Sequence, residues 1–124
     1  MTSTAREVVE LYNYVVWNQR NLDLGDQLVA DRVIRHTAGE AVMLTREQNR
    51  QHVEDTCASF DRITFELPVL VAGDDGEHVT TIWHAILTAE DGDETVIANI
   101  EVFRVVGGKI TEIYNAGHLH GYWR

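Results

Sequence analysis

One carboxylate in the chain lies where a charge is costly, and it is the first candidate for chemistry. Glu101 lies near the middle of the run from Val96 to Val106, which is mostly apolar and rich in the β-branched residues typical of strands. A buried carboxyl needs hydrogen-bonding partners, or its pKa rises because burial disfavours the charged form. A carboxyl kept neutral can donate a hydrogen bond or act as an acid or base near neutral pH. Glu101 is therefore the predicted centre of an acid–base site.

The strand after Glu101 is predicted to supply a tyrosine and a histidine. Residues 107–108 are Gly-Gly, which tolerates the positive φ angles that both central residues of a type I′ hairpin turn require. Pairing the residues on either side of this turn places Tyr114 opposite Glu101 and extends the same face toward His118.

The strand before Glu101 is predicted to supply a second histidine. If the acidic turn at residues 90–93 holds two or four residues, His84 shares a face with Glu101. A one-residue bulge in either hairpin would invert this face and present Trp83 or Asn115 instead. Strand parity therefore decides which side chains the site contains.

These residue types suit proton transfer on a carbonyl compound. A histidine beside a carboxyl can shuttle a proton, and a tyrosine hydroxyl can polarise a carbonyl oxygen where negative charge develops. The predicted reactions are proton abstraction beside a carbonyl, as in isomerisation or aldol-type ring closure, and the addition of water. Two alternatives stay open. A buried His–Glu pair could serve a binding cavity without chemistry, and His118 with His120 could present two imidazoles to a metal.

An N-terminal helix is predicted to form one wall of the site. Residues 4–7, Thr-Ala-Arg-Glu, have the spacing of a capping box, and apolar residues from Val8 to Val16 recur at helical spacing. Tyr14 and Trp17 border this apolar stripe. They either pack in the core or line a ligand pocket.

A second helix and a short strand follow. Asn21 is an N-cap residue type ahead of a helix to about Val29, and residues 31–39 predict a strand that ends in a Gly turn. His36 lies at the end of this strand, where its side chain points into a cavity mouth or is a structural or surface histidine.

A third helix precedes the remaining strands. Residues 45–48 have the spacing of another capping box and predict a helix to about Phe60, in which His52 is solvated and Cys57 is inert core. Strands are then predicted over residues 63–71, with Pro68 at an edge or bulge, and over residues 78–89. Three helices, a short strand and a four-stranded antiparallel meander give an α+β fold.

Composition narrows the functional classes. The 124 residues predict a single domain, 1–124, and the formal charge of −10 argues against nucleic acid as a partner. The single cysteine excludes an internal disulfide and suits a reducing cytoplasm. No apolar run approaches the roughly 20 residues of a membrane span, and the polar start lacks the core of a signal peptide.

The chain resembles the SnoaL-like polyketide cyclase and ketosteroid isomerase-like branch of the nuclear transport factor two-like superfamily. The order of helices and strands, the segment from Asn21 to His36 and the segment from Val102 to Glu112 carry the resemblance. It implies a cone-shaped α+β barrel, with N-terminal helices packed in a strongly curved, mostly antiparallel sheet. It also implies a deep apolar pocket and a homodimer formed through the outer face of the sheet. The superfamily hosts cyclases, isomerases, dehydratases, epoxide hydrolases and non-catalytic domains.

Individual positions can be compared with this family. His36 matches a strand-end position at which ketosteroid isomerases hold an aspartate base, and Glu101 matches the acid that donates to the steroid oxygen. SnoaL-like cyclases typically have Glu-His-Trp in the last strand, followed by an aspartate. Here Tyr114 replaces the tryptophan, and His118 stands where the aspartate would be.

The sequence thus predicts a cofactor-independent acid–base enzyme for a small apolar or polycyclic molecule that carries a carbonyl or epoxide. A non-catalytic ligand-binding or protein-interaction module and a metal-dependent enzyme are the alternatives. The predicted catalytic residues are His36, His84, Glu101, Tyr114 and His118. The predicted substrate-binding residues are Tyr14, Trp17, Trp83, Phe103 and Asn115, and no metal ligand or cofactor is assigned.

Overall fold

The computed structural model describes residues 3–124. The helical elements are α1 (Ala5–Leu11), the π-helix η1 (Tyr12–Trp17), α2 (Leu22–Leu28) and α3 (Arg46–Ala58). The strands are β1 (Val29–Thr37), β2 (Glu40–Thr45), β3 (Arg62–Ala72), β4 (His78–Thr88), β5 (Glu94–Val106), β6 (Lys109–Asn115) and β7 (Leu119–His120).

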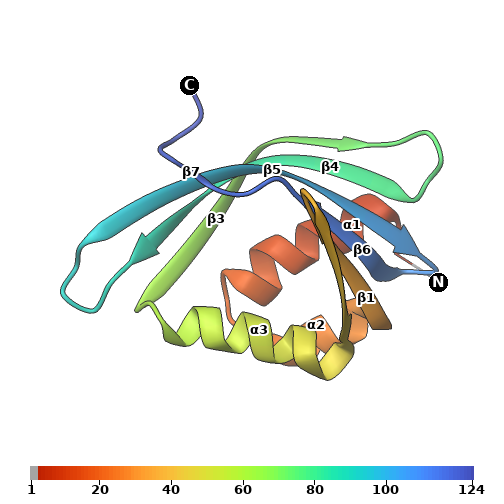
Figure 1. Cartoon of the computed structure of the whole chain (residues 1–124), viewed down its shortest axis with the longest axis horizontal. Coiled ribbons are helices and arrows are strands. Elements are labelled where there is room, and N and C mark those ends of the chain that lie inside the picture. The colour runs from red at the N-terminus through yellow and green to blue at the C-terminus, as the bar shows by residue number, and fades with distance from the viewer. Residues whose placement is uncertain (1–2) are drawn as a thin grey trace.

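One mixed sheet of seven strands contains every strand of the described residues. Its order is β2-β1-β6-β5-β4-β3, and β7 pairs with β5. β1 runs parallel to β6, and the other neighbouring strands are antiparallel. The sheet arches over the helices, which lie on its concave side (Figure 1). The predicted α+β cone is therefore confirmed, as an open curved sheet and not as a closed barrel.

The predicted helix starts are confirmed by their caps. Thr4 accepts a hydrogen bond from the backbone of Glu7, and Thr45 accepts one from the backbone of Gln48, each within a complete capping box. Asn21 caps α2 by accepting from a backbone N–H of the first turn. These short-range signals depend only on residues three or four apart, which is why they could be predicted without the fold.

The first helix changes form at Tyr12. Residues 12–17 are a π-helix, and the backbone N–H of Asn18 donates to the carbonyl of Asn13 at 3.2 Å, an i→i+5 hydrogen bond. A π turn holds more residues than an α turn and so turns additional side chains toward one side. Asn13 and Trp17 are both buried here together with Tyr12. A regular helix was expected instead, and its period left Asn13 outside the buried stripe.

The hairpin of β1 and β2 was only partly predicted. A strand around His36 was expected, but β1 begins two residues earlier than expected and is followed by β2, which was missed. Nearly all of β2 is exposed, so its sequence carries little alternation between apolar and polar residues.

The predicted register between β4 and β5 is wrong. Thr88 pairs with Glu94, so residues 89–93 form the turn and their number is odd. An odd turn reverses the parity that a turn of two or four residues would have imposed. Trp83 therefore shares the face of Glu101, and His84 lies on the opposite face.

The predicted register between β5 and β6 is correct at the turn and wrong at Glu101. Val106 pairs with Lys109, as expected, but the ladder has a bulge between the turn and Glu101. Because a bulge inserts one extra residue, Asn115 lies opposite Glu101 and Tyr114 falls on the other face.

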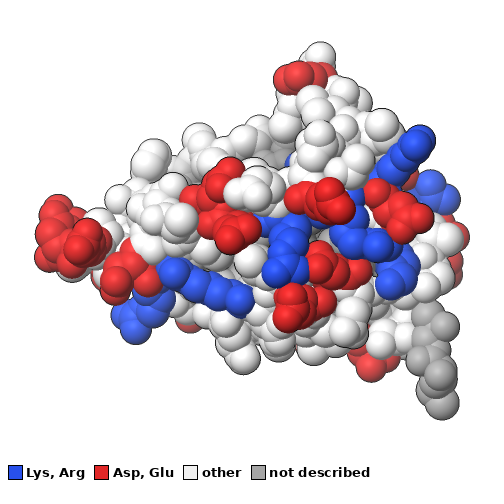
Figure 2. Space-filling model, turned by 90° about the horizontal axis from the view of Figure 1, so that it is seen from below, with Lys and Arg blue, Asp and Glu red and all other residues white. Residues whose placement is uncertain are grey.

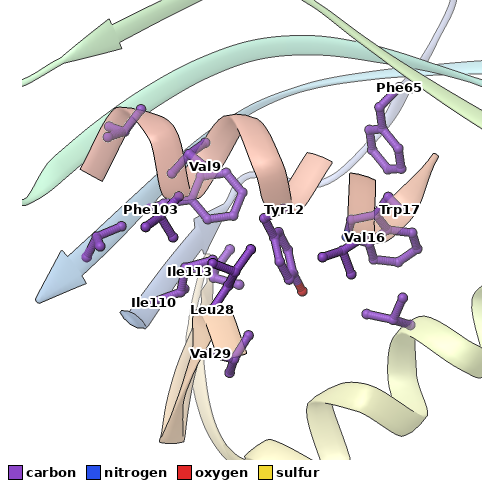
Figure 3. Packing of buried hydrophobic residues seen from close by; sticks show 14 of the residues in the cluster. Val9, Tyr12, Val16, Trp17, Leu28, Val29, Phe65, Phe103, Ile110 and Ile113 are labelled. Atoms are coloured by element: carbon purple, nitrogen blue, oxygen red, sulfur yellow. The ribbon is translucent and has the colours of Figure 1, made fainter. Parts of the chain in front are cut away.

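The buried core lies between the helices and the concave face of the sheet. Figure 3 shows Tyr12, Val16 and Trp17 of η1 on one side of this core. The sheet contributes Phe103 of β5 and Ile113 of β6, both about 1% exposed. One layer of helices against one face of the sheet leaves the opposite, convex face free of helices (Figure 1).

Candidate functional site

A cavity of about 160 Å³ opens on the concave side of the sheet. Its apolar lining consists of Trp17, Ile63, Phe65, Trp83, Leu87, Ile97, Phe103 and Ile113. Its polar lining consists of Tyr12, Asn13, Arg35, His52, Thr56, Glu101, Asn115 and His118. A few convergent polar groups in an apolar cavity are typical of small-molecule sites.

Glu101 is the acidic residue of this lining, and it is 8% exposed. The side-chain amide of Asn115, on the neighbouring strand β6, donates to Glu101 Oε2 at 2.8 Å. Burial raises the pKa of Glu101 above its ordinary value, and the charge of Arg35, the Asn115 amide and the Trp83 indole N–H oppose that rise. Burial is the largest of these influences, so the net effect is a raised pKa.

A chain of amides connects Glu101 with His118. The amide of Asn99 donates to Asn115 Oδ1, and it also lies 3.4 Å from His118 Nδ1. The backbone N–H of Gly117 donates to the same Asn115 oxygen at 3.1 Å, which fixes the orientation of that amide. A donating Asn99 makes His118 Nδ1 an acceptor, so the proton of a neutral imidazole lies on Nε2.

A second group of hydrogen bonds holds Arg35 in the cavity wall. Arg35 Nε and Nη2 donate to Asn49 Oδ1 at 3.3 and 3.1 Å. Asn49 in turn donates to the hydroxyl of Tyr12 at 3.2 Å. Because the hydroxyl oxygen accepts this bond, the proton of Tyr12 stays free to donate to a ligand. Tyr12, and not Tyr114, is thus the tyrosine of the cavity lining.

His52 lies at the mouth of the cavity. The residue as a whole is exposed, but its ring lies 6.3 Å from that of Trp17 and lines the cavity. Burial of the ring, and then the charge of Arg35, lower the pKa of His52 below its ordinary value. The imidazole is therefore neutral near pH 7 and can accept a proton. His52 is exposed, as expected, and it lines the cavity as well.

Six residues that the sequence singled out line the cavity. They are Trp17, Trp83, Glu101, Phe103, Asn115 and His118. Their catalytic and binding roles remain predictions.

Two of the predicted catalytic residues lie together on the convex face, away from the cavity. His36 Nε2 is 3.0 Å from Glu112 Oε1, and its ring stacks on Tyr114 with the ring centres 4.1 Å apart. Strand alternation explains this, because Arg35 takes the inward position of β1 and its neighbour points outward. The expectation that His36 faces the cavity mouth is wrong, and so is the pairing of Tyr114 with Glu101.

Two further placements are corrected. His84 Nε2 lies 2.9 Å from Glu66 on the convex face, so its predicted pairing with Glu101 is wrong. Tyr14 is exposed and lines a separate hollow beside Pro68, so it forms no wall of the cavity.

The metal alternative has no support from the arrangement of side chains. In residues 3–124, no three or more His, Cys, Asp or Glu side chains gather as potential ligands. His120 pairs with Ile97 through β7 and is exposed, whereas His118 lines the cavity.

No helix within the described part of the chain has the length and apolar character needed to cross a membrane.

Sequence reasoning missed Tyr12, Asn13, Arg35 and Asn99. Arg35 carried a usable signal, because it follows the buried Val33 at a spacing of two residues and so shares its side of the strand. Asn99 shares the parity of Glu101 in the same way. The π-helix that brings in Asn13 has no comparable signal.

Several solved structures share the fold. A proposed polyketide cyclase from Acidithiobacillus ferrooxidans has a TM-score of 0.79 at 20% identity, over 93% of this chain and 88% of that chain. The epoxide hydrolase/cyclase-like enzyme SalBIII has a role in pyran ring formation in the polyether salinomycin. Its TM-score is 0.75 at 21% identity, over 94% of this chain and 90% of that chain. An LEH-like epoxide hydrolase from M. tuberculosis has a TM-score of 0.71 at 18% identity, over 90% of this chain and 80% of that chain. At such identities the likeness establishes the fold alone.

Among curated proteins, none is significantly similar to this chain in sequence. The sequence does match the family model of the SnoaL-like domain over residues 8–113. This match spans most of the chain and includes both the helices and the strands that form the cavity. It confirms the resemblance that the helix and strand order had suggested, and the chain therefore belongs to the SnoaL-like domain family.

Proposed function

We propose that the protein is an acid–base enzyme that works without a cofactor on a small apolar molecule carrying a carbonyl or epoxide oxygen. One observation carries the proposal. Glu101 is a buried carboxyl with a raised pKa in the lining of an apolar cavity. Such a carboxyl can stay protonated at neutral pH and donate its proton to a substrate oxygen.

The acid in this proposal is Glu101. Because Oε2 accepts a hydrogen bond from Asn115, Oε1 is the oxygen that carries the proton and faces the substrate. After the proton has moved, the carboxylate is stabilised by that same amide and by the positive charge of Arg35. The groups that oppose the rise in the Glu101 pKa are thus the groups that stabilise its conjugate base.

The base in this proposal is His52. Its pKa is lowered while that of Glu101 is raised, so the two shifts bring the base and the acid of this cavity closer together in pKa. With a ketone, His52 would remove a proton beside the carbonyl while Glu101 protonates the oxygen to give an enol. With an epoxide, His52 would deprotonate a water that attacks carbon as the C–O bond breaks and Glu101 protonates the leaving oxygen. In both cases the imidazolium returns the proton to the Glu101 carboxylate, directly or through solvent.

The structural neighbours support this class of reaction without specifying it. They include a proposed polyketide cyclase and an LEH-like epoxide hydrolase. A shared fold alone does not transfer an activity, so the proposal depends on the groups in this cavity.

A substrate screen with one variant and a matched control tests the proposal. Small cyclic ketones and epoxides are incubated with the wild-type protein, and products are detected by mass spectrometry. For the best substrate, Glu101→Gln should lower kcat/KM by about 10²- to 10⁴-fold, because the amide cannot transfer a proton. Glu54→Gln removes an exposed carboxyl of α3 and should leave kcat/KM unchanged. Turnover that survives in Glu101→Gln contradicts the role of Glu101, and binding without turnover supports the non-catalytic alternative.

We also propose that the protein is a homodimer and works in the cytoplasm. Support for the dimer is that large apolar side chains near the C-terminus are exposed, namely Ile100, Leu119, Tyr122 and Trp123. Support for a reducing compartment is that Cys57 is a buried free thiol.

A further inference from the structure

One permanently charged side chain in the cavity lacks a counter-ion. The ion pairs of residues 3–124 involve other arginines, namely Arg6, Arg46, Arg50 and Arg104. On the helix side of the molecule, blue and red side chains lie next to one another over the surface (Figure 2). Arg35 differs from these paired arginines, because its described hydrogen bonds go only to the neutral amide of Asn49.

Glu101 does not neutralise Arg35. The charge of Arg35 acts on the carboxyl, but the two groups form no ion pair in the structure. Burial outweighs that charge in its effect on the pKa of Glu101. Arg35 thus has no ion-pair partner among residues 3–124, in a cavity where low polarity strengthens its attraction for an anion.

A second donor in the lining is available to a ligand. Trp83 is 2% exposed, and its indole N–H acts on the nearby Glu101 carboxyl without forming a well-aligned hydrogen bond to it or to any other group of residues 3–124. An indole N–H and a guanidinium can only donate, so Trp83 and Arg35 can both offer a hydrogen bond to an acceptor atom of a ligand. A buried donor without a partner costs free energy, which a ligand oxygen in this cavity would recover.

The remaining lining is apolar and limits the size of the ligand. The cavity of about 160 Å³ is walled by aromatic and aliphatic side chains, including Trp17, Phe65 and Phe103. A buried cavity of about 150 Å³ accommodates a molecule as large as benzene. The space therefore suits one six-membered ring with a small polar substituent.

We infer that the substrate of the proposed reaction carries, besides its carbonyl or epoxide oxygen, a carboxylate on a small ring that pairs with Arg35, given that this cavity is the site of that reaction. The ring lies among the apolar side chains, and one carboxylate oxygen lies within reach of a cavity N–H donor. The charge on the ligand then complements the one unpaired cation of the cavity, despite the formal charge of −10 on the chain as a whole.

Two probes that differ in charge but hardly in shape test the inference. Phenylacetate and phenylacetamide are titrated into the full-length protein, and binding is followed by calorimetry and by the fluorescence of the tryptophans in the cavity. The carboxylate should bind at least about ten-fold more tightly than the amide, the size expected of one charge-assisted hydrogen bond. Equal binding of the two probes, tighter binding of the amide or binding of neither overturns the inference.

Variants of two arginines on the same strand assign the preference to one residue. Arg35→Met keeps an unbranched side chain without the charge. This variant should bind phenylacetate and phenylacetamide with about equal affinity. Arg32→Met makes the same change of net charge at an exposed position of β1 and should keep the wild-type preference. A preference that survives in Arg35→Met overturns the inference.

A spectroscopic measurement decides the question even if Arg35→Met does not fold. In the wild-type protein, the NMR signal of the Arg35 Nε–H should shift with phenylacetate and stay in place with phenylacetamide. An unchanged signal at saturating phenylacetate contradicts the inference. The test also separates this inference from the proposed function, because binding preference is measured without turnover. If Glu101→Gln has no effect on catalysis, the preference for the carboxylate can still stand. If the two probes bind equally, the catalytic role of Glu101 can still stand.

Discussion

The environment of a carboxyl, and not its residue type, decides whether it is charged. Glu112 lies on the convex face, where Arg104 and then His36 lower its pKa through hydrogen bonds. Glu101 lies one strand away in the cavity, where burial raises its pKa. The same type of side chain therefore has a lowered pKa on one face of the sheet and a raised pKa on the other.

The raised pKa of Glu101 predicts how stability changes with pH. Above its ordinary value of 4.5, the unfolded chain loses this proton while the native state keeps it, so rising pH favours unfolding until the native carboxyl ionises. Glu101→Gln removes this contribution. As the pH rises above about 4.5, the free energy of unfolding of Glu101→Gln should therefore increase relative to that of the wild type, as measured by urea unfolding. Glu54→Gln should follow the wild-type profile, and parallel profiles for Glu101→Gln and the wild type would contradict the raised pKa.

The Asn99 amide is predicted to set the tautomer of His118. In the wild-type protein, ¹⁵N NMR of neutral His118 should show the proton on Nε2, because Asn99 donates to Nδ1. Asn99→Ala should give a mixture of tautomers, and the loss of a buried hydrogen bond should cost about 1–3 kcal/mol in the free energy of unfolding.

The isosteric variant Asn99→Asp provides the matched control. A carboxylate can only accept, so it should attract the proton of His118 to Nδ1 and reverse the tautomer seen in the wild type. The same tautomer in all three proteins would show that Asn99 does not set it.

At the scale of elements, two irregularities shape the cavity. The π-helix η1 turns Asn13 and Trp17 toward it together with Tyr12. The bulge in the hairpin of β5 and β6 places Asn115, and not Tyr114, opposite Glu101. Regular elements at both places would have produced a different set of polar groups.

The turn of this hairpin gives a prediction for stability. Gly107 has a φ of 59°, and a Cβ built there would meet nothing within 4 Å, so its backbone conformation is the constraint. Gly107→Ala should lower the free energy of unfolding by about 1 kcal/mol, because alanine is strained at positive φ. Gly107→Asn should lower the free energy of unfolding by less, because asparagine tolerates this conformation. Urea unfolding checks both variants, and equal losses would contradict the explanation.

At the scale of the whole molecule, the two faces of the sheet have different roles. The helices lie on the concave face (Figure 1), together with the core and the cavity. The convex face carries the pairs His36–Glu112 and His84–Glu66 and exposed apolar side chains such as Ile100. One cluster of buried apolar residues runs through both the helices and the strands, and we propose on this basis that the chain folds as one domain.

The proposed homodimer is predicted to use the convex face. Ile100 is 45% exposed on β5 and points away from the cavity, so Ile100→Asp should convert the dimer to a monomer. Met43→Asp introduces the same charge at a 53% exposed position on β2, at the edge of the sheet, and should leave the dimer intact. Light scattering coupled to gel filtration measures both masses. A wild-type protein that stays monomeric at high concentration would contradict the dimer.

Local sequence determined much of the framework. Capping residues such as Thr4 and Thr45 act on backbone groups a few positions away, so the helix starts could be predicted. The Gly-Gly turn at residues 107–108 and the strands around it were predictable for the same reason. Glu101 could also be singled out, because a carboxylate within an apolar strand requires a buried partner wherever that strand lies.

Only the tertiary structure decided which side chains meet Glu101. A shift of one residue moves a whole strand to the other face, and both shifts in this sheet arise from an extra residue that no local signal marks. His84 and Tyr114 were thereby exchanged for Trp83 and Asn115. Arg35 and His52 came to the cavity from other elements, because a hydrogen bond across a fold depends on packing between segments that are distant in sequence.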